Sequence, residues 1–139
     1  IDNAPTALDL AGLPIPADMQ GKSLMPVFQG NGNTTKDWRN TMYYHYYEFA
    51  PPHWVLPNYG IRTEQYKLIC YYTINEWEFF DLEKDPDEME SLLVMEGMKV
   101  KPGYEDVVKD LVNQLAKLKE EYKDDTGGPV KFWPVRAYN

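Results

Sequence analysis

The sequence predicts an α+β fold, in which an antiparallel β-sheet of about four strands packs against a long C-terminal amphipathic helix and follows two short helices. Residues 38–82 are rich in aromatic and β-branched side chains and are interrupted by turn residues, as in a series of strands. Residues 104–122 repeat apolar side chains at spacings of three and four, as in an amphipathic helix. A length of 139 residues with 43% hydrophobic content suits one compact domain.

Residues 1–30 predict two short helices around a proline-rich connector. Pro5 lies near the start of the first helix and Gly12 ends it, whereas Ser23 is the expected N-cap of the second helix and Gly30 its C-terminal stop. The polar run NGNTTKD at 31–37 is expected to be a loop and the boundary of a subdomain.

Three aromatic-rich stretches predict the sheet, with turns expected at 50–53 and 73–75: TMYYHYYEF, YGIRTEQYKLICYY and EWEFFDL. Period two separates the two faces of the first strand. Tyr43, His45, Tyr47 and Phe49 share one face, and Tyr44, Tyr46 and Glu48 share the other. A catalytic dyad of His45 and Glu48 within this strand is therefore not expected.

The segment after the sheet begins with Asp85-Pro86, which predicts a turn followed by a short helix whose first turn is acidic. The long helix then carries a buried stripe: Tyr104, Val108, Leu111, Leu115, Leu118 and Tyr122. The tail has aromatic residues at 132, 133 and 138 without periodicity, so we expect it to lie against an apolar surface.

Composition argues against several classes of partner. The net charge of -8 and only 14 Lys and Arg residues do not favour nucleic acid or an anionic membrane. No apolar run approaches the length of about 18 residues that spans a bilayer. A lone Cys70 excludes an internal disulfide and a Cys-rich zinc site.

Taken alone, the residues predict no catalytic group and no metal ligand. Cys70 shares a strand face with Leu68 and Tyr72, where a free cysteine is usually a small buried hydrophobic residue. The two histidines, His45 and His53, share no face with a common carboxylate. The run DLEKDPDE lacks the glycine and the ligand spacing of an EF-hand loop, and no phosphate-binding glycine loop is present.

Four segments in this order resemble the C-terminal part of type I sulfatases, the formylglycine-dependent sulfate ester hydrolases: IDNAPTALDLAGLPIPADMQGKSLMPVFQG, YGIRTEQYKLICYY, EWEFFDLEKDPDEMESLL and the closing helix. The resemblance is strongest to bacterial enzymes acting on sulfated glycans, such as N-acetylglucosamine-6-sulfatases. It implies that 1–30 are the trailing helices of the α/β catalytic domain, 31–125 the C-terminal subdomain and 126–139 an irregular tail. The start at Ile1 leads us to expect a piece of a longer polypeptide.

The resemblance also implies what this chain lacks. Sulfatases use a formylglycine made in a Cys/Ser-x-Pro-x-Arg motif beside a calcium ion, but Cys70 is followed by Tyr-Tyr-Thr. We therefore expect calcium and formylglycine only in the full-length enzyme and no sulfatase activity in this chain alone. The implied partners are its own N-terminal sulfatase domain and a sulfated carbohydrate, and the implied location is periplasmic or secreted.

The resemblance also implies structural roles for four polar residues of the sheet region. Asp81, Asp85 and Glu88 are expected to satisfy the amides of turns and helix starts, and Arg62 to pair inside the sheet.

Three residues are candidates for binding substrate: His45, His53 and Trp54. In glycan sulfatases, side chains from this subdomain reach the pocket rim, where an imidazole can hydrogen-bond a hydroxyl and a ring can stack on the sugar. The alternatives are that Tyr43, His45 and Tyr47 pack on the long helix, with His45 bonded to backbone, and that Trp54 fills the interface with the catalytic domain.

A different class of function stays open, namely a carbohydrate-binding or protein-interaction module without catalysis. If the chain is instead a fragment, the surface that faced the catalytic domain should be an apolar patch, and the fragment is expected to self-associate through it.

Overall fold

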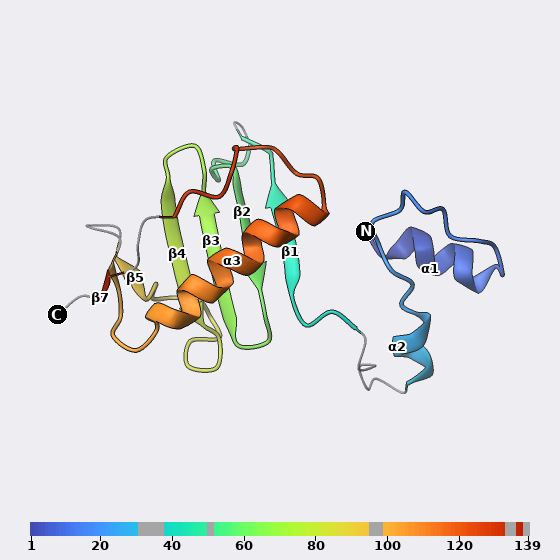
Figure 1. The fold of residues 1–139 in the computed structure, drawn as a ribbon, viewed down its shortest axis with the longest axis horizontal. Helices are drawn as coiled ribbons and strands as arrows, with labels where there is room; N and C mark the ends of the chain where they lie inside the picture. Colours follow the sequence, from blue (N-terminus) through green and yellow to red (C-terminus); the bar gives the residue numbers. More distant parts are fainter. Residues whose placement is uncertain (31–37, 50–51, 95–98, 133–135, 138–139) are drawn as a thin grey trace. The chain divides into compact units, whose positions relative to one another are not determined.

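The structure, a computed structural model, describes residues 1–139 except 31–37, 50–51, 95–98, 133–135 and 138–139 (Figure 1). Its contacts divide the chain into two compact units, Ile1–Arg39 (unit 1) and Asn40–Asn139 (unit 2). The predicted loop at 31–37 and part of the predicted turn at 50–53 lie outside the described residues. Composition suggested one compact domain, whereas the buried apolar side chains of the core all belong to unit 2.

Unit 1 contains the two predicted short helices, α1 (Asn3–Leu10) and α2 (Met25–Gln29). Gly12 has a φ of 69°, a left-handed conformation that terminates α1 at low steric cost. The N-cap of α2 is Leu24 rather than the predicted Ser23. Ser23 lies one residue before this N-cap, and its Oγ accepts a hydrogen bond at 3.1 Å from the N–H of Met25, the first residue of α2.

Unit 2 is built on a four-stranded antiparallel sheet whose strands lie side by side in sequence order, β1-β2-β3-β4. The strands are β1 (Met42–Tyr46), β2 (Asn58–Arg62), β3 (Tyr66–Tyr71) and β4 (Glu76–Asp81). Short connections join β2 to β3 and β3 to β4, as antiparallel neighbours allow, whereas a longer connection joins β1 to β2. The α+β prediction is confirmed.

Helix α3 (Glu105–Glu121) lies across one face of the sheet (Figure 1). Its Val108, Leu111 and Leu115 are at most 2% exposed, which confirms the apolar stripe. The side chains that meet them from the sheet include Ile61, Leu68, Cys70, Trp77 and Phe79. Burial of this stripe stabilises the helix, since most of the stability of a helix in a protein comes from the packing of its apolar face.

The predicted alternation of faces on β1 is confirmed. Tyr43 packs against the core beneath α3, and its ring stacks on Tyr122 with centroids 5.7 Å apart. Tyr44 belongs to a smaller apolar cluster on the other face, with Ile69 and Phe80.

The chain between β4 and α3 differs from prediction. No helix follows Asp85 among the described residues of this segment, where the backbone instead makes turns. Glu88 has a φ of 55°, which a right-handed helix cannot contain. Two short strands follow, β5 (Leu93–Val94) and β6 (Lys99–Val100), and they pair antiparallel.

Described residues of the tail contact the rest of unit 2. The Phe132 ring lies nearly perpendicular to that of Trp77 at a centroid distance of 4.8 Å, as expected for an aromatic residue of the tail. Strand β7 (Arg136–Ala137) pairs in parallel with β6, so the tail is not wholly irregular. Trp133 and Tyr138 lie outside the described residues. Within the described part of the chain, no helix is long and apolar enough to cross a membrane.

Candidate functional site

Strand β1 and the residues after α3 bring together a buried histidine and a carboxylate. His45 Nδ1 lies within hydrogen-bond distance of Asp124 Oδ2, and the two side chains are 3% and 8% exposed. The other ring nitrogen, Nε2, lies 3.3 Å from the Tyr72 hydroxyl oxygen. His45 therefore joins a chain of side-chain contacts from Asp124 to Tyr72, rather than bonding to backbone.

Aromatic rings enclose this histidine. Tyr47 stacks on it with centroids 3.7 Å apart and planes 19° apart. The rings of Tyr59 and Tyr72 lie nearly perpendicular to the imidazole, with centroids 5.7 and 5.4 Å from its own. We call these residues the His45 cluster: Tyr43, His45, Tyr47, Tyr59, Tyr72 and Asp124. It answers why the strand mixes an imidazole with so many rings, since the rings exclude water from the His45–Asp124 contact.

The hydrogen bonds to Asp124 keep its carboxylate charged. Burial alone would raise the pKa of Asp124, but the bonds that it accepts outweigh burial and hold the pKa well below its usual range. Tyr43 donates its hydroxyl to Oδ2 at 2.5 Å, and the Thr126 N–H donates to Oδ1 at 3.0 Å. Burial, followed by the bond to Asp124, raises the pKa of Tyr43 far above its ordinary value, so this hydroxyl remains a donor.

Lys119, near the end of α3, stabilises the segment after the helix that carries Asp124 and Thr126. Its side chain is buried, with 5% exposure, and Nζ lies 4.0 Å from the centroid of the Tyr59 ring. The ammonium also donates to the Thr126 carbonyl at 2.7 Å. Sequence reasoning missed Lys119 and Asp124, although Lys119 follows Leu115 by four positions and so lies on the buried side of the helix.

The other two predicted residues lie in the connection between β1 and β2. The Trp54 side chain is 71% exposed, and the edge of its ring meets Phe49, itself 53% exposed, at 6.4 Å. His53 is exposed as well. Among the described residues, neither His53 nor Trp54 shares a hydrogen bond or ring contact with His45. The structure thus places His45 in the interior and the other pair on the surface.

A hollow of about 490 Å³ opens beside the end of α3. It is lined by residues that include Lys119, Asp124 and Val130. The three predicted substrate-binding residues are not among those that line it. The hollow therefore adds no direct support to sugar contact by those residues.

The residues of this chain do not fit the cofactors of a sulfatase. Cys70 is 2% exposed in β3, and burial raises the pKa of its thiol to about 11, so the sulfur is a neutral core group. Among the described residues, no three His, Cys, Asp or Glu side chains are arranged to hold a metal ion.

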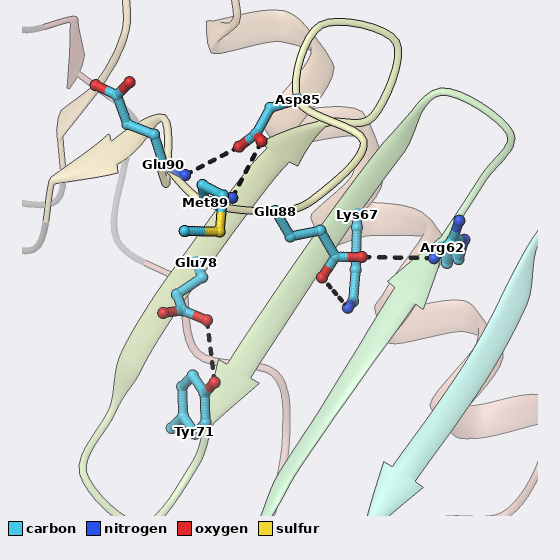
Figure 2. A network of polar contacts seen from close by, with 8 residues as sticks. All are labelled: Arg62, Lys67, Tyr71, Glu78, Asp85, Glu88, Met89 and Glu90. Atoms are coloured by element: carbon cyan, nitrogen blue, oxygen red, sulfur yellow. Dashed lines mark hydrogen bonds and ion pairs between the residues drawn. The ribbon is translucent and has the colours of Figure 1, made fainter.

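A second polar network lies on the sheet face opposite α3 (Figure 2). Glu88 binds Lys67 through one carboxylate oxygen and Arg62 through the other, the latter at 3.5 Å. The prediction that Glu88 satisfies amides is therefore wrong, because its carboxylate pairs with the side chains of Lys67 and Arg62. Arg62 is 48% exposed, so its predicted pairing inside the sheet is also wrong.

Asp85 and Asp81 stabilise the turns after β4. Asp85 accepts the N–H groups of Met89 and Glu90 at 3.1 and 2.9 Å, which confirms its turn role (Figure 2). Asp81 is 1% exposed and accepts hydrogen bonds from Lys84 Nζ at 2.9 Å and from the Tyr104 hydroxyl at 2.7 Å. Burial would raise the pKa of Asp81, but these bonds outweigh it and lower the pKa. The bond between Asp81 and Tyr104, the N-cap of α3, thus links the end of β4 to the start of α3.

Comparison with known proteins accounts for this arrangement. Residues 1–121 match the family described as N-sulphoglucosamine sulphohydrolase, C-terminal. The chain belongs to this family. The sulfatase resemblance of the sequence is thereby confirmed, and the matched region includes unit 1, the four-stranded sheet and α3.

One curated relative of this sulfatase C-terminal region is an N-acetylglucosamine-6-O-sulfatase of Bacteroides thetaiotaomicron, 44% identical over 126 residues. The match covers 90% of this chain and 22% of that protein. An arylsulfatase of Clostridium perfringens is 30% identical over 134 residues, which cover 96% of this chain and 26% of that enzyme. The chain thus spans about a quarter of the length of these relatives.

Solved structures share the fold. One is a protein in complex with its substrate, D-glucosamine-2-N,6-O-disulfate, and it matches with a TM-score of 0.81 and 42% identity over 91% of this chain and 24% of that one. A 2-O glycosaminoglycan sulfatase matches with a TM-score of 0.71 and 25% identity over 96% of this chain and 30% of its own.

Proposed function

We propose that this chain is the C-terminal part of a sulfuric ester hydrolase that removes sulfate from sulfated glycans. In this role it stabilises the catalytic domain and shapes the substrate pocket. The observation that supports the proposal is the match of residues 1–121 to a sulfatase C-terminal family, together with 44% identity to an N-acetylglucosamine-6-O-sulfatase. The calcium ion and formylglycine of the reaction would reside in the catalytic domain, and the whole protein would be periplasmic or secreted.

Unit 1 supports a catalytic domain as partner, because unit 1 has almost no core of its own. Among its described residues, only Pro5 and Thr6 are buried. Several large apolar side chains are instead exposed: Ile1, Leu10, Leu13, Ile15, Met19 and Phe28. Helices of 8 and 5 residues are not stable without packing. We propose that these side chains pack in the catalytic domain of the longer protein.

Self-association of the isolated chain tests this part. Residues 1–139 should self-associate and bind a hydrophobic dye, whereas residues 40–139 should be monomeric and bind much less. Light scattering and dye fluorescence compare the two. Equal behaviour of the two chains would contradict the assignment of unit 1 to the catalytic domain.

For substrate contact we propose His53 and Trp54. Both are exposed in one connection of the sheet, where Phe49 adds a second exposed ring. An exposed indole can stack on the apolar face of a sugar, and a nearby imidazole can hydrogen-bond a hydroxyl. Direct contact through His45 stays a prediction, and it would require its ring, 3% exposed beneath Tyr47, to be uncovered.

The test is an assay of sulfate release from 6-sulfated N-acetylglucosamine with calcium present. The full-length product of the gene should be active and residues 1–139 inactive. In the full-length protein, His53→Ala and Trp54→Ala should each raise KM about tenfold, equivalent to about 1.4 kcal/mol, with little change in kcat. Ile74→Ala, at an exposed apolar residue in the β3–β4 turn, is the matched control.

The exposed rings also suit a second function, a carbohydrate-binding module without catalysis. Trp54 and Phe49 would then bind a glycan by stacking alone. Absence of sulfatase activity in the full-length protein, combined with glycan binding by residues 1–139, would favour this module over the hydrolase.

A further inference from the structure

The connection that carries His53 and Trp54 is anchored at both ends to unit 2. At its far end, the buried Asn58 side chain donates from Nδ2 to the Leu56 carbonyl at 2.9 Å. At its near end, Tyr47 follows the last residue of β1, and its ring stacks on His45. Tyr47 is 60% exposed, and it is attached to the fold by this stack and by the interaction of its hydroxyl with the Asp124 carboxylate.

Asp124 sets the orientation of the ring on which Tyr47 stacks. An imidazole on a strand can rotate about its side-chain bonds, but a hydrogen bond from Nδ1 to a fixed carboxylate selects one orientation. The carboxylate is itself fixed, since the Asp124 N–H donates to the Lys119 carbonyl at 2.9 Å and Oδ1 accepts from Thr126. The distal contact of Nε2 with Tyr72 completes the restraint.

Packing alone does not explain why His45 and Asp124 are paired in the interior. A buried polar contact gains little over apolar side chains of similar volume, because both groups lose their hydration. A directional contact, however, fixes the plane of a ring in a way that apolar packing does not. The plane of His45 matters most for Tyr47, whose ring lies 3.7 Å away and nearly parallel.

We propose that Asp124 is a positioning residue for substrate binding. Through His45, and through its own contact with the Tyr47 hydroxyl, Asp124 holds Tyr47 and thereby the start of the connection that presents His53 and Trp54 to the sugar. The inference rests on the proposed function, because the sugar contact is itself a proposal.

The experiment uses the full-length protein with Asp124→Asn, Tyr47→Ala and the control Asp125→Asn, whose side chain is exposed next to Asp124 in sequence. We expect Asp124→Asn and Tyr47→Ala to raise KM for 6-sulfated N-acetylglucosamine at least fivefold with kcat changed less than twofold. Asp125→Asn should match the wild type.

Amide hydrogen exchange gives a second readout that does not depend on activity. In Asp124→Asn, exchange should become at least fivefold faster at residues 47–49 and 53–56, while β3 and β4 keep wild-type protection. Faster exchange throughout unit 2 would mean a merely structural role and would overturn the proposal.

The two proposals fail in distinguishable ways. An active wild type whose KM is unchanged by Asp124→Asn overturns the positioning role and leaves the sulfatase function standing. An inactive wild type overturns the sulfatase function, and the exchange comparison then decides by itself whether Asp124 holds the connection.

Discussion

Replacing Leu115 by alanine should destabilise unit 2 strongly. Leu115 is 0% exposed at the centre of the α3 stripe, and its neighbours in the core include Ile61 and Leu68, each also 0% exposed. These two side chains stand on paired strands and cannot collapse into the space that the substitution leaves. The loss should therefore lie in the upper part of the range for buried leucines, about 3–5 kcal/mol. For a domain of this size that corresponds to a fall in Tm of about 12–40 °C.

Urea unfolding followed by circular dichroism measures this change on residues 40–139. Lys117→Ala is the matched control on the same helix, because Lys117 is exposed and alanine is also a good helix former. The control should change the free energy of unfolding by no more than about 0.5 kcal/mol. If Leu115→Ala cost less than about 1 kcal/mol, the packing of α3 on the sheet would be refuted.

Three further predictions concern single sites of unit 2. Gly60→Ala should cost about 1–3 kcal/mol in urea unfolding, because an added Cβ would lie 2.5 Å from the Leu68 carbonyl oxygen; a neutral effect would contradict the register of β2 and β3. The pKa of Asp124 is lowered in the folded state, so its stabilisation should be complete above the pKa of an unfolded aspartate, about 3.9, and decline as pH falls. A gap in stability between wild type and Asp124→Asn that stays constant from pH 6 to pH 2.5 would refute this. Cys70 should resist alkylation at pH 8 until the protein unfolds, since its thiol is buried and its pKa is raised to about 11; labelling of the native protein, followed by mass spectrometry, would count against it.

Periodicity made the sheet faces and α3 predictable. Alternation along β1 separated Tyr43 from Tyr44 correctly, because a strand with two covered faces must place successive side chains on opposite sides. The three-four spacing of the stripe likewise needs no knowledge of the partner sheet. The prediction of a short helix after Asp85 was wrong. The Asp85 carboxylate accepts hydrogen bonds from the Met89 and Glu90 amides, and such local bonds compete with those of a helix.

The His45 cluster was not predictable in the same way. Asp124 lies 79 residues from His45 and beyond the end of α3, in a segment with no apolar period. Only the three-dimensional packing of the helix on the sheet brings its carboxylate to β1. The exposure of Trp54 and His53 is easier to predict from the sequence, since connections between strands usually lie on the surface.

The meander order of the sheet has a kinetic consequence. Each strand pairs with the next along the chain, so the sheet can form through successive local hairpins at small cost in loop entropy. The contact between His45 and Asp124 closes a segment of 79 residues and cannot form until α3 has docked. We therefore expect Asp124→Asn to accelerate unfolding while leaving the folding rate of residues 40–139 nearly unchanged, a difference that stopped-flow chevron plots measure. Slower folding in this variant would instead place Asp124 in the folding nucleus.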